Sequence, residues 1–151
     1  MAIRKSVIHA ALRISKLREQ SAAAKAQRAL RALNEAIGAA DQLEAFAADY
    51  RRDAVRLVGL PEVDLSLILS TRTFADKLQE TAGSQRELMQ PLREQVDGLT
   101  REHYATKRRL EGVEKIARRI QQEEVNGLMM KEAKEVEDNL ASRLTRKRST
   151  R

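Results

Sequence analysis

Apolar residues recur along this chain in alternating steps of three and four, which is the heptad spacing of a coiled coil. The spacing predicts a first helix over about residues 2–58, with phase slips between its blocks that we interpret as stutters or stammers. Its apolar positions are Ile3, Val7, Ala10, Ile14 and Leu17, then Leu30, Leu33, Ile37 and Ala40, then Leu43, Ala47, Tyr50, Ala54 and Leu57.

The same spacing predicts a second, longer helix over about residues 66–145. Pro91 lies inside it, and proline removes a backbone N–H and crowds the preceding turn, so we expect a bend near residues 87–91. Ser84 and Glu87 also fit a capping box, which leaves a true break open. The apolar positions are Leu67, Thr71, Phe74, Leu78, Thr81, Gln85, Leu88 and Leu92, then Val96, Leu99, His103, Thr106, Leu110, Val113, Ala117 and Ile120, then Met129, Ala133, Val136, Leu140 and Leu144.

A turn over about residues 59–65 separates the two helices. Gly59 can end a helix with a positive φ, and Pro61 cannot continue one. Asp64 or Ser66 can cap the helix that follows.

The numbers of facing residues in an antiparallel hairpin should add to a nearly constant value, here 124 for Leu57 with Leu67, Tyr50 with Phe74 and Val7 with Ala117. We therefore predict an all-α fold: two long helices in an antiparallel coiled-coil hairpin. It forms a single domain over residues 1–151, in which the second helix overhangs from about residue 121 and a disordered basic tail covers about residues 146–151.

The composition agrees with a rod that lacks a thick core. Charged residues make up 34% of the 151 residues and aromatic residues 3%, which is typical of long helices and coiled coils. The absence of cysteine excludes disulfides and thiolate metal sites and fits a cytoplasmic protein.

The net charge of +7 is unevenly distributed. Residues 1–31 contain eight Lys or Arg and one Glu, and residues 143–151 contain five Lys or Arg and no acid. Both ends lie toward one pole of an antiparallel hairpin, so this pole should attract an acidic surface.

No constellation of residues points to catalysis. His9 and His103 are the only histidines and lie far apart on the predicted hairpin, and no metal-ligand spacing or phosphate-binding loop is present. A two-helix rod also offers no concave pocket. We expect a protein that is not an enzyme and has no cofactor. A basic coiled coil associated with nucleic acid and a homodimeric helical scaffold are alternatives, although no aromatics accompany the basic clusters for base stacking.

One region has a familiar motif pattern. It reads Tyr104-x-x-Lys107-Arg108-Arg109-Leu110-Glu111-x-Val113-Glu114-Lys115-Ile116-x-Arg118-Arg119, followed by Glu132-Ala133-Lys134-Glu135-Val136-Glu137-Asp138. This pattern resembles the FliJ/YscO family, the stalk proteins of flagellar and virulence-type type III export machines. The final Glu-Asp pair is in the reverse order to the family pattern.

The resemblance implies a non-enzymatic stalk that binds in the pore of a hexameric export ATPase and couples it to the cytoplasmic ring of the export gate. It also implies a link to export chaperones and a cytoplasmic location at the base of a membrane-embedded secretion machine. The secretion branch and the direction of docking stay open. The residues expected to bind the ATPase are Arg4, Lys5, Arg13, Lys16, Arg118 and Arg119, and those expected to bind the gate are Leu60, Val63 and Leu65.

Overall fold

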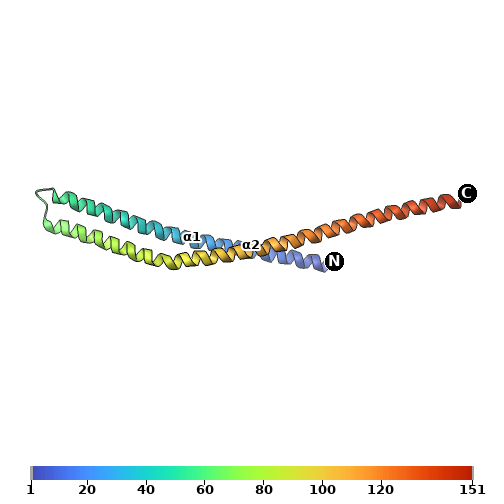
Figure 1. Cartoon of the computed structure of the whole chain (residues 1–151), viewed down its shortest axis with the longest axis horizontal. Coiled ribbons are helices and arrows are strands. Elements are labelled where there is room, and N and C mark those ends of the chain that lie inside the picture. Colours follow the sequence, from blue (N-terminus) through green and yellow to red (C-terminus); the bar gives the residue numbers. More distant parts are fainter. Residues whose placement is uncertain (1, 151) are drawn as a thin grey trace. The chain divides into compact units, whose positions relative to one another are not determined.

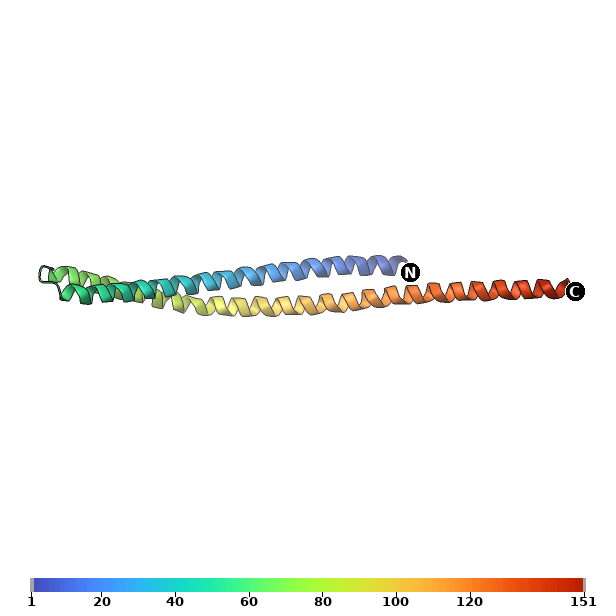
Figure 2. The ribbon, with the colours of Figure 1, turned by 90° about the horizontal axis from the view of Figure 1, so that it is seen from above.

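The computed structural model describes residues 2–150, which form two helices and no strand (Figure 1). Helix α1 spans Ala2–Val58 and helix α2 spans Leu65–Ser149, so that α2 is the longer, with 85 residues against 57. The helices pack against each other in antiparallel directions on either side of the turn (Figures 1 and 2). The expected all-α helical hairpin is confirmed.

Contacts within the chain divide it into two compact units, where the sequence analysis treated residues 1–151 as one domain. The terminal unit consists of Met1–Glu19 and Thr106–Arg151, and the turn unit consists of Gln20–Ala105. In each unit a stretch of α1 packs along a stretch of α2.

Small side chains form the core of the turn unit. Ala40, Ala47 and Ala54 of α1 are buried at intervals of seven, as are Ala75 and Ala82 of α2. Leu33 and Met89 continue the two series toward the middle of the helices, where they cluster with Ala40. The methyl side chains of the five buried alanines let the two helix backbones approach closely, so the core is thin and tightly packed.

The buried series keeps one heptad phase along each helix. With the exception of the more exposed Tyr50, every position of the two series is buried or partly buried. The predicted stutters are therefore absent. The series are Ile8, Leu12, Ser15, Glu19, Ala22, Ala26, Ala29, Leu33, Ala36, Ala40, Leu43, Ala47, Tyr50, Ala54 and Leu57 in α1, and Ile68, Thr71, Ala75, Leu78, Ala82, Gln85, Met89, Leu92, Val96, Leu99, His103, Thr106, Leu110, Val113, Ala117, Ile120 and Glu124 in α2.

Several large residues assigned to the seam from the sequence face solvent instead. Leu67, Phe74 and Leu88 of α2 are exposed, and their inward neighbours Ile68, Ala75 and Met89 take the seam positions. The same holds at the start of α1, where Ile3, Val7, Ile14 and Leu17 are exposed. The prediction was wrong at these positions because it followed the largest apolar side chains, whereas the small residues complete a heptad series without a phase slip. From Leu92 to Ile120 the predicted positions are partly buried, as expected.

Contacts between the helices do not all follow the predicted sum of 124. The rings of Tyr50 and Phe74, a predicted pair, meet edge to face with centroids 4.9 Å apart, and their residue numbers add to 124. The salt bridges join Lys5 to Glu124, Arg51 to Asp76, and Arg86 to Asp41 and Glu44, and these residue numbers add to 127–130.

The turn ends α1 without a left-handed residue. The N–H of Gly59 donates to the carbonyl oxygen of Arg56 at 3.1 Å, and the N–H of Leu60 donates to the carbonyl oxygen of Leu57 at 3.2 Å. No glycine in residues 2–150 has a positive φ, so the expected left-handed Gly59 is wrong.

Asp64 caps α2. Its Oδ1 accepts from the backbone N–H of Ser66 at 3.1 Å, and its Oδ2 accepts from the Ser66 hydroxyl at 2.8 Å. These two bonds lower the pKa of the Asp64 carboxyl, with the hydroxyl bond the larger cause. The cap satisfies one of the backbone N–H groups at the start of α2 that have no partner within the helix.

Helix α2 continues through Pro91, as expected, and changes direction in the stretch coloured yellow in Figure 1. It extends through Arg146, Lys147 and Arg148 to Ser149, residues that the sequence analysis placed in a disordered tail, whereas Arg151 lies outside the described residues. Basic side chains in the last turn interact favourably with the carboxyl end of the helix dipole.

Candidate partner-binding surfaces

The terminal unit pairs the first turns of α1 with the middle of α2 and leaves the end of α2 alone. Lys5 Nζ lies 3.3 Å from Glu124 Oε2, and this salt bridge marks the end of the paired region. From residue 125 onward every described residue of α2 is exposed. We call residues 125–149 the overhang; both ribbon views show it running past the start of α1 (Figures 1 and 2).

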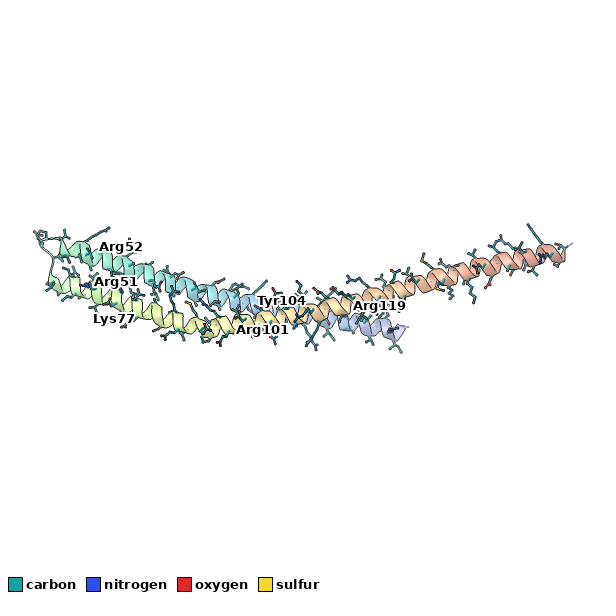
Figure 3. All side chains as sticks on the ribbon, viewed as in Figure 1. Arg51, Arg52, Lys77, Arg101, Tyr104 and Arg119 are labelled. Atoms are coloured by element: carbon teal, nitrogen blue, oxygen red, sulfur yellow. The ribbon has the colours of Figure 1, made fainter. Side chains whose placement is uncertain are left out.

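The basic residues predicted to bind an ATPase all lie in the terminal unit, and all are exposed. Four lie on α1, and Arg118 and Arg119 lie on α2; Figure 3 labels Arg119. Lys5 is engaged by Glu124, with about half of its side chain still exposed.

A shallow groove of about 670 Å³ lies beside this salt bridge. Its apolar lining includes Leu12, Ile120 and Leu128, and its polar lining includes Lys5 and Arg118, so two of the six predicted basic residues share it. A two-helix rod is expected to offer no concave pocket, but this groove forms because α1 begins partway along α2. Within residues 2–150 no group of three or more His, Cys, Asp or Glu is placed to hold a metal ion.

The residues predicted to bind an export gate lie in and next to the turn. Leu60 and Leu65 are exposed, and Val63 is partly buried. The apolar surface here is larger than the sequence analysis expected, because Val55 and Val58 at the end of α1 are also exposed and line a second groove with Ile68. Both valines lie outside the heptad series of α1, and α1 ends at Val58. These two facts could have identified them from the sequence as exposed apolar residues near the turn.

Away from the turn, salt bridges join α1 to α2 within the turn unit. Arg86 Nε and Nη2 donate to the two carboxylate oxygens of Glu44 at 2.7 and 2.8 Å, and Nη2 also donates to Asp41 at 2.7 Å. The bond from Arg86 lowers the pKa of Glu44, while the two acids raise the pKa of Arg86. This cluster sits along the seam and stabilises the pairing of α1 with α2.

His103 also belongs to the turn unit, where it is partly buried and stacks against Tyr104 with ring centroids 6.0 Å apart. Among the described residues no helix is long and apolar enough to cross a membrane.

The family model of the flagellar FliJ protein matches residues 9–150. The chain belongs to the FliJ family. Membership connects it with flagellar or type III protein export, in agreement with the resemblance carried by residues 104–138. No curated protein and no solved structure matches the chain significantly.

The FliJ match extends over both helices, the turn and the overhang. It includes Arg13, Lys16, Arg118 and Arg119, and it begins just after Arg4 and Lys5. All three turn residues predicted to contact a gate also lie within the match.

Proposed function

We propose that this FliJ-family chain is a non-enzymatic stalk of a type III export apparatus. The terminal unit enters the pore of the hexameric export ATPase, and the turn contacts the cytoplasmic ring of the export gate. Export chaperones are further partners. The protein acts on the cytoplasmic side, at the base of the membrane-embedded secretion machine.

The observation that carries this proposal is the exposed set of basic side chains on the terminal unit. Arg4, Arg13, Lys16, Arg118 and Arg119 form no salt bridge with any described residue, so their charges are free to meet an acidic partner. A surface of one sign raises the rate of encounter with a surface of the other sign and selects its orientation.

The overhang supports the same orientation. A single exposed helix is about 10–12 Å wide with its side chains, narrower than a helix pair, and can enter a pore further than the paired region. The exposed apolar residues of the turn, Leu60 and Leu65, form the kind of surface that protein partners cover.

A charge-reversal experiment tests the docking direction. Changing Arg4, Lys5, Arg118 and Arg119 to Glu should weaken binding to the export ATPase at least tenfold at low salt, and less at high salt because salt screens exposed charges. The matched control changes Arg51, Arg52, Lys77 and Arg101 to Glu, which are exposed basic residues of the turn unit (Figure 3). Unchanged binding of the first variant, or equal weakening by both, would mean that the terminal unit does not face the ATPase.

The contact with the gate needs its own variant. Leu60→Ser with Leu65→Ser should weaken binding to the gate ring and leave ATPase binding unchanged, because exposed apolar side chains lose their buried area in the complex. Leu88→Ser is the control, since Leu88 is an exposed leucine of the same unit away from the turn. If the turn variant still binds the gate ring as well as the unaltered chain does, the gate contact lies elsewhere on the chain.

A further inference from the structure

The start of α1 carries a second apolar stripe that faces away from α2. Its members, Ile3, Val7, Ala10, Ile14 and Leu17, repeat in steps of four and three. The four large ones are between 50% and 82% exposed, while Ala10 is partly buried, as are Ile8, Leu12 and Ser15 on the inner side. A heptad stripe whose large side chains face solvent indicates a surface built for another helix.

The overhang carries a stripe with the same spacing. Met129, Ala133, Val136 and Leu140 repeat in steps of four, three and four. All four are exposed, and the three large ones are between 54% and 64% exposed. The molecule therefore has two unpartnered helical faces of matching period, both within the terminal unit.

The charges beside the two stripes are opposite. Arg13 and Arg18 occupy the flanking heptad positions of the α1 stripe, and Glu132 and Glu137 occupy those of the overhang stripe. These four residues are exposed and form no salt bridge with any residue that the structure describes. Flanking charges of this kind decide which helices pair and in which register.

One parallel register satisfies both the packing and the charges. With Ala10 opposite Met129, Ile14 falls opposite Ala133 and Leu17 opposite Val136, so that a small residue meets a large one in the first two layers. In parallel heptads the flanking g position of one helix pairs with the e position of the next heptad on the other helix. In the same register this pairs Arg13 with Glu137 and Arg18 with Glu132.

The two stripes of one chain cannot meet. The register within the chain, marked by Lys5 with Glu124, places Ile14 across from residues near 115. Ala133 lies about 18 residues further along the same continuous helix, which is roughly 27 Å at 1.5 Å per residue.

We propose that a second copy of the chain covers these faces. The overhang of each copy lies along the outer stripe of the other copy's α1, and the two copies point in opposite directions. This arrangement is closed by a two-fold axis near the Lys5–Glu124 salt bridge, so both overhangs are used and no open filament forms. The interface leaves the seam within each chain intact. It covers Arg13 and the overhang, so the dimer is a form of the free chain that excludes the ATPase contact proposed above.

Disulfide trapping tests the register directly, because the chain has no cysteine. A preparation carrying Ile14→Cys is mixed with one carrying Ala133→Cys and oxidised. The expected product is a covalent dimer of the two chains, formed faster than with the control pair Ile14→Cys and Lys134→Cys, since residue 134 points about 100° away around the helix. Equal rates for the two pairs would overturn the proposed contact.

Charge-reversed variants measured by sedimentation test the dimer without a covalent cross-link. The chain should shift from monomer to dimer as its concentration rises. Arg13→Glu and Glu137→Arg should each raise the dissociation constant of the dimer roughly tenfold, because the two-fold axis makes each altered pair occur twice in the dimer. The double variant, in which the two charges are exchanged, should recover most of the lost affinity.

A chain that stays monomeric at every concentration overturns the proposal, as does a dimer that responds equally to Arg101→Glu, an exposed change in the turn unit. These measurements use the chain alone, so their outcome is separate from ATPase or gate binding.

Discussion

Arg86 of α2 holds Glu44 of α1 through two hydrogen bonds, with Nε 2.7 Å from Oε1 and Nη2 2.8 Å from Oε2. This two-pronged geometry matches the planar guanidinium to the carboxylate and fixes one helix against the other. The bond from Arg86 lowers the pKa of Glu44 below its usual value of 4.5. The stabilisation from Glu44 is therefore complete above about pH 4.5 and is lost as the pH falls through the lowered pKa.

We expect Glu44→Gln to lower the thermal midpoint by about 2 °C at pH 7, because the side chains are partly exposed and the gain from such a pair is small. The difference from the unaltered chain should shrink below pH 4.5, where the carboxylate becomes protonated. Circular dichroism melts between pH 3 and 7 measure this. Glu87→Gln, an exposed acid without a salt bridge to a described residue, should change neither the midpoint nor its pH dependence.

Because buried alanines line the seam, the size of a side chain there should affect stability more than its hydrophobicity does. Ala47 is fully buried, so Ala47→Leu must force the helices apart and should cost about 1–3 kcal/mol of unfolding free energy. Ala48→Leu introduces the same side chain at the exposed neighbour and should change stability by less than about 0.5 kcal/mol. Urea unfolding of both variants measures the difference; equal effects would mean that the seam is not tightly packed.

Gly59 offers a test of the turn. Its φ is not positive, and a Cβ built there would approach nothing closer than the carbonyl oxygen of Arg56 at 3.5 Å. Gly59→Ala should therefore stabilise the chain by about 0.4–1 kcal/mol, since alanine restricts the unfolded chain more than glycine does. Gly98→Ala, in open space within α2, should stabilise by a similar amount. A loss of stability at Gly59 alone would indicate a left-handed turn residue.

Pro91 leaves one turn of α2 without a backbone hydrogen bond. Pro91→Ala restores the N–H donor and should raise the free energy of unfolding by about 1–3 kcal/mol. Arg93→Ala, an exposed position in the same turn, should change it by less than about 0.5 kcal/mol. If the proline variant is not stabilised, the bend in α2 is supported by packing rather than caused by the proline.

The sequence by itself determined the helices and the turn. Heptad spacing and the Gly59-x-Pro61 pair are local signals, and they located both helices to within a few residues of α1 and α2. The basic ends and the absence of metal-ligand spacing could also be read directly, since they depend only on which residues are present. The match to the FliJ family agrees with the motif at residues 104–138.

Only the tertiary structure decided which apolar stripe of each helix faces inward. The start of α1 offers two, one through Val7 and Ile14 and one through Ile8 and Leu12, and α2 offers Phe74 or Ala75. The choice depends on both helices at once, because the phase that keeps small residues in contact lets the backbones pack closely. A count of large apolar side chains on one helix cannot contain that information. It selected the inner positions of α2 from Leu92 to Ile120, but at the start of each helix it selected residues that the folded chain leaves exposed.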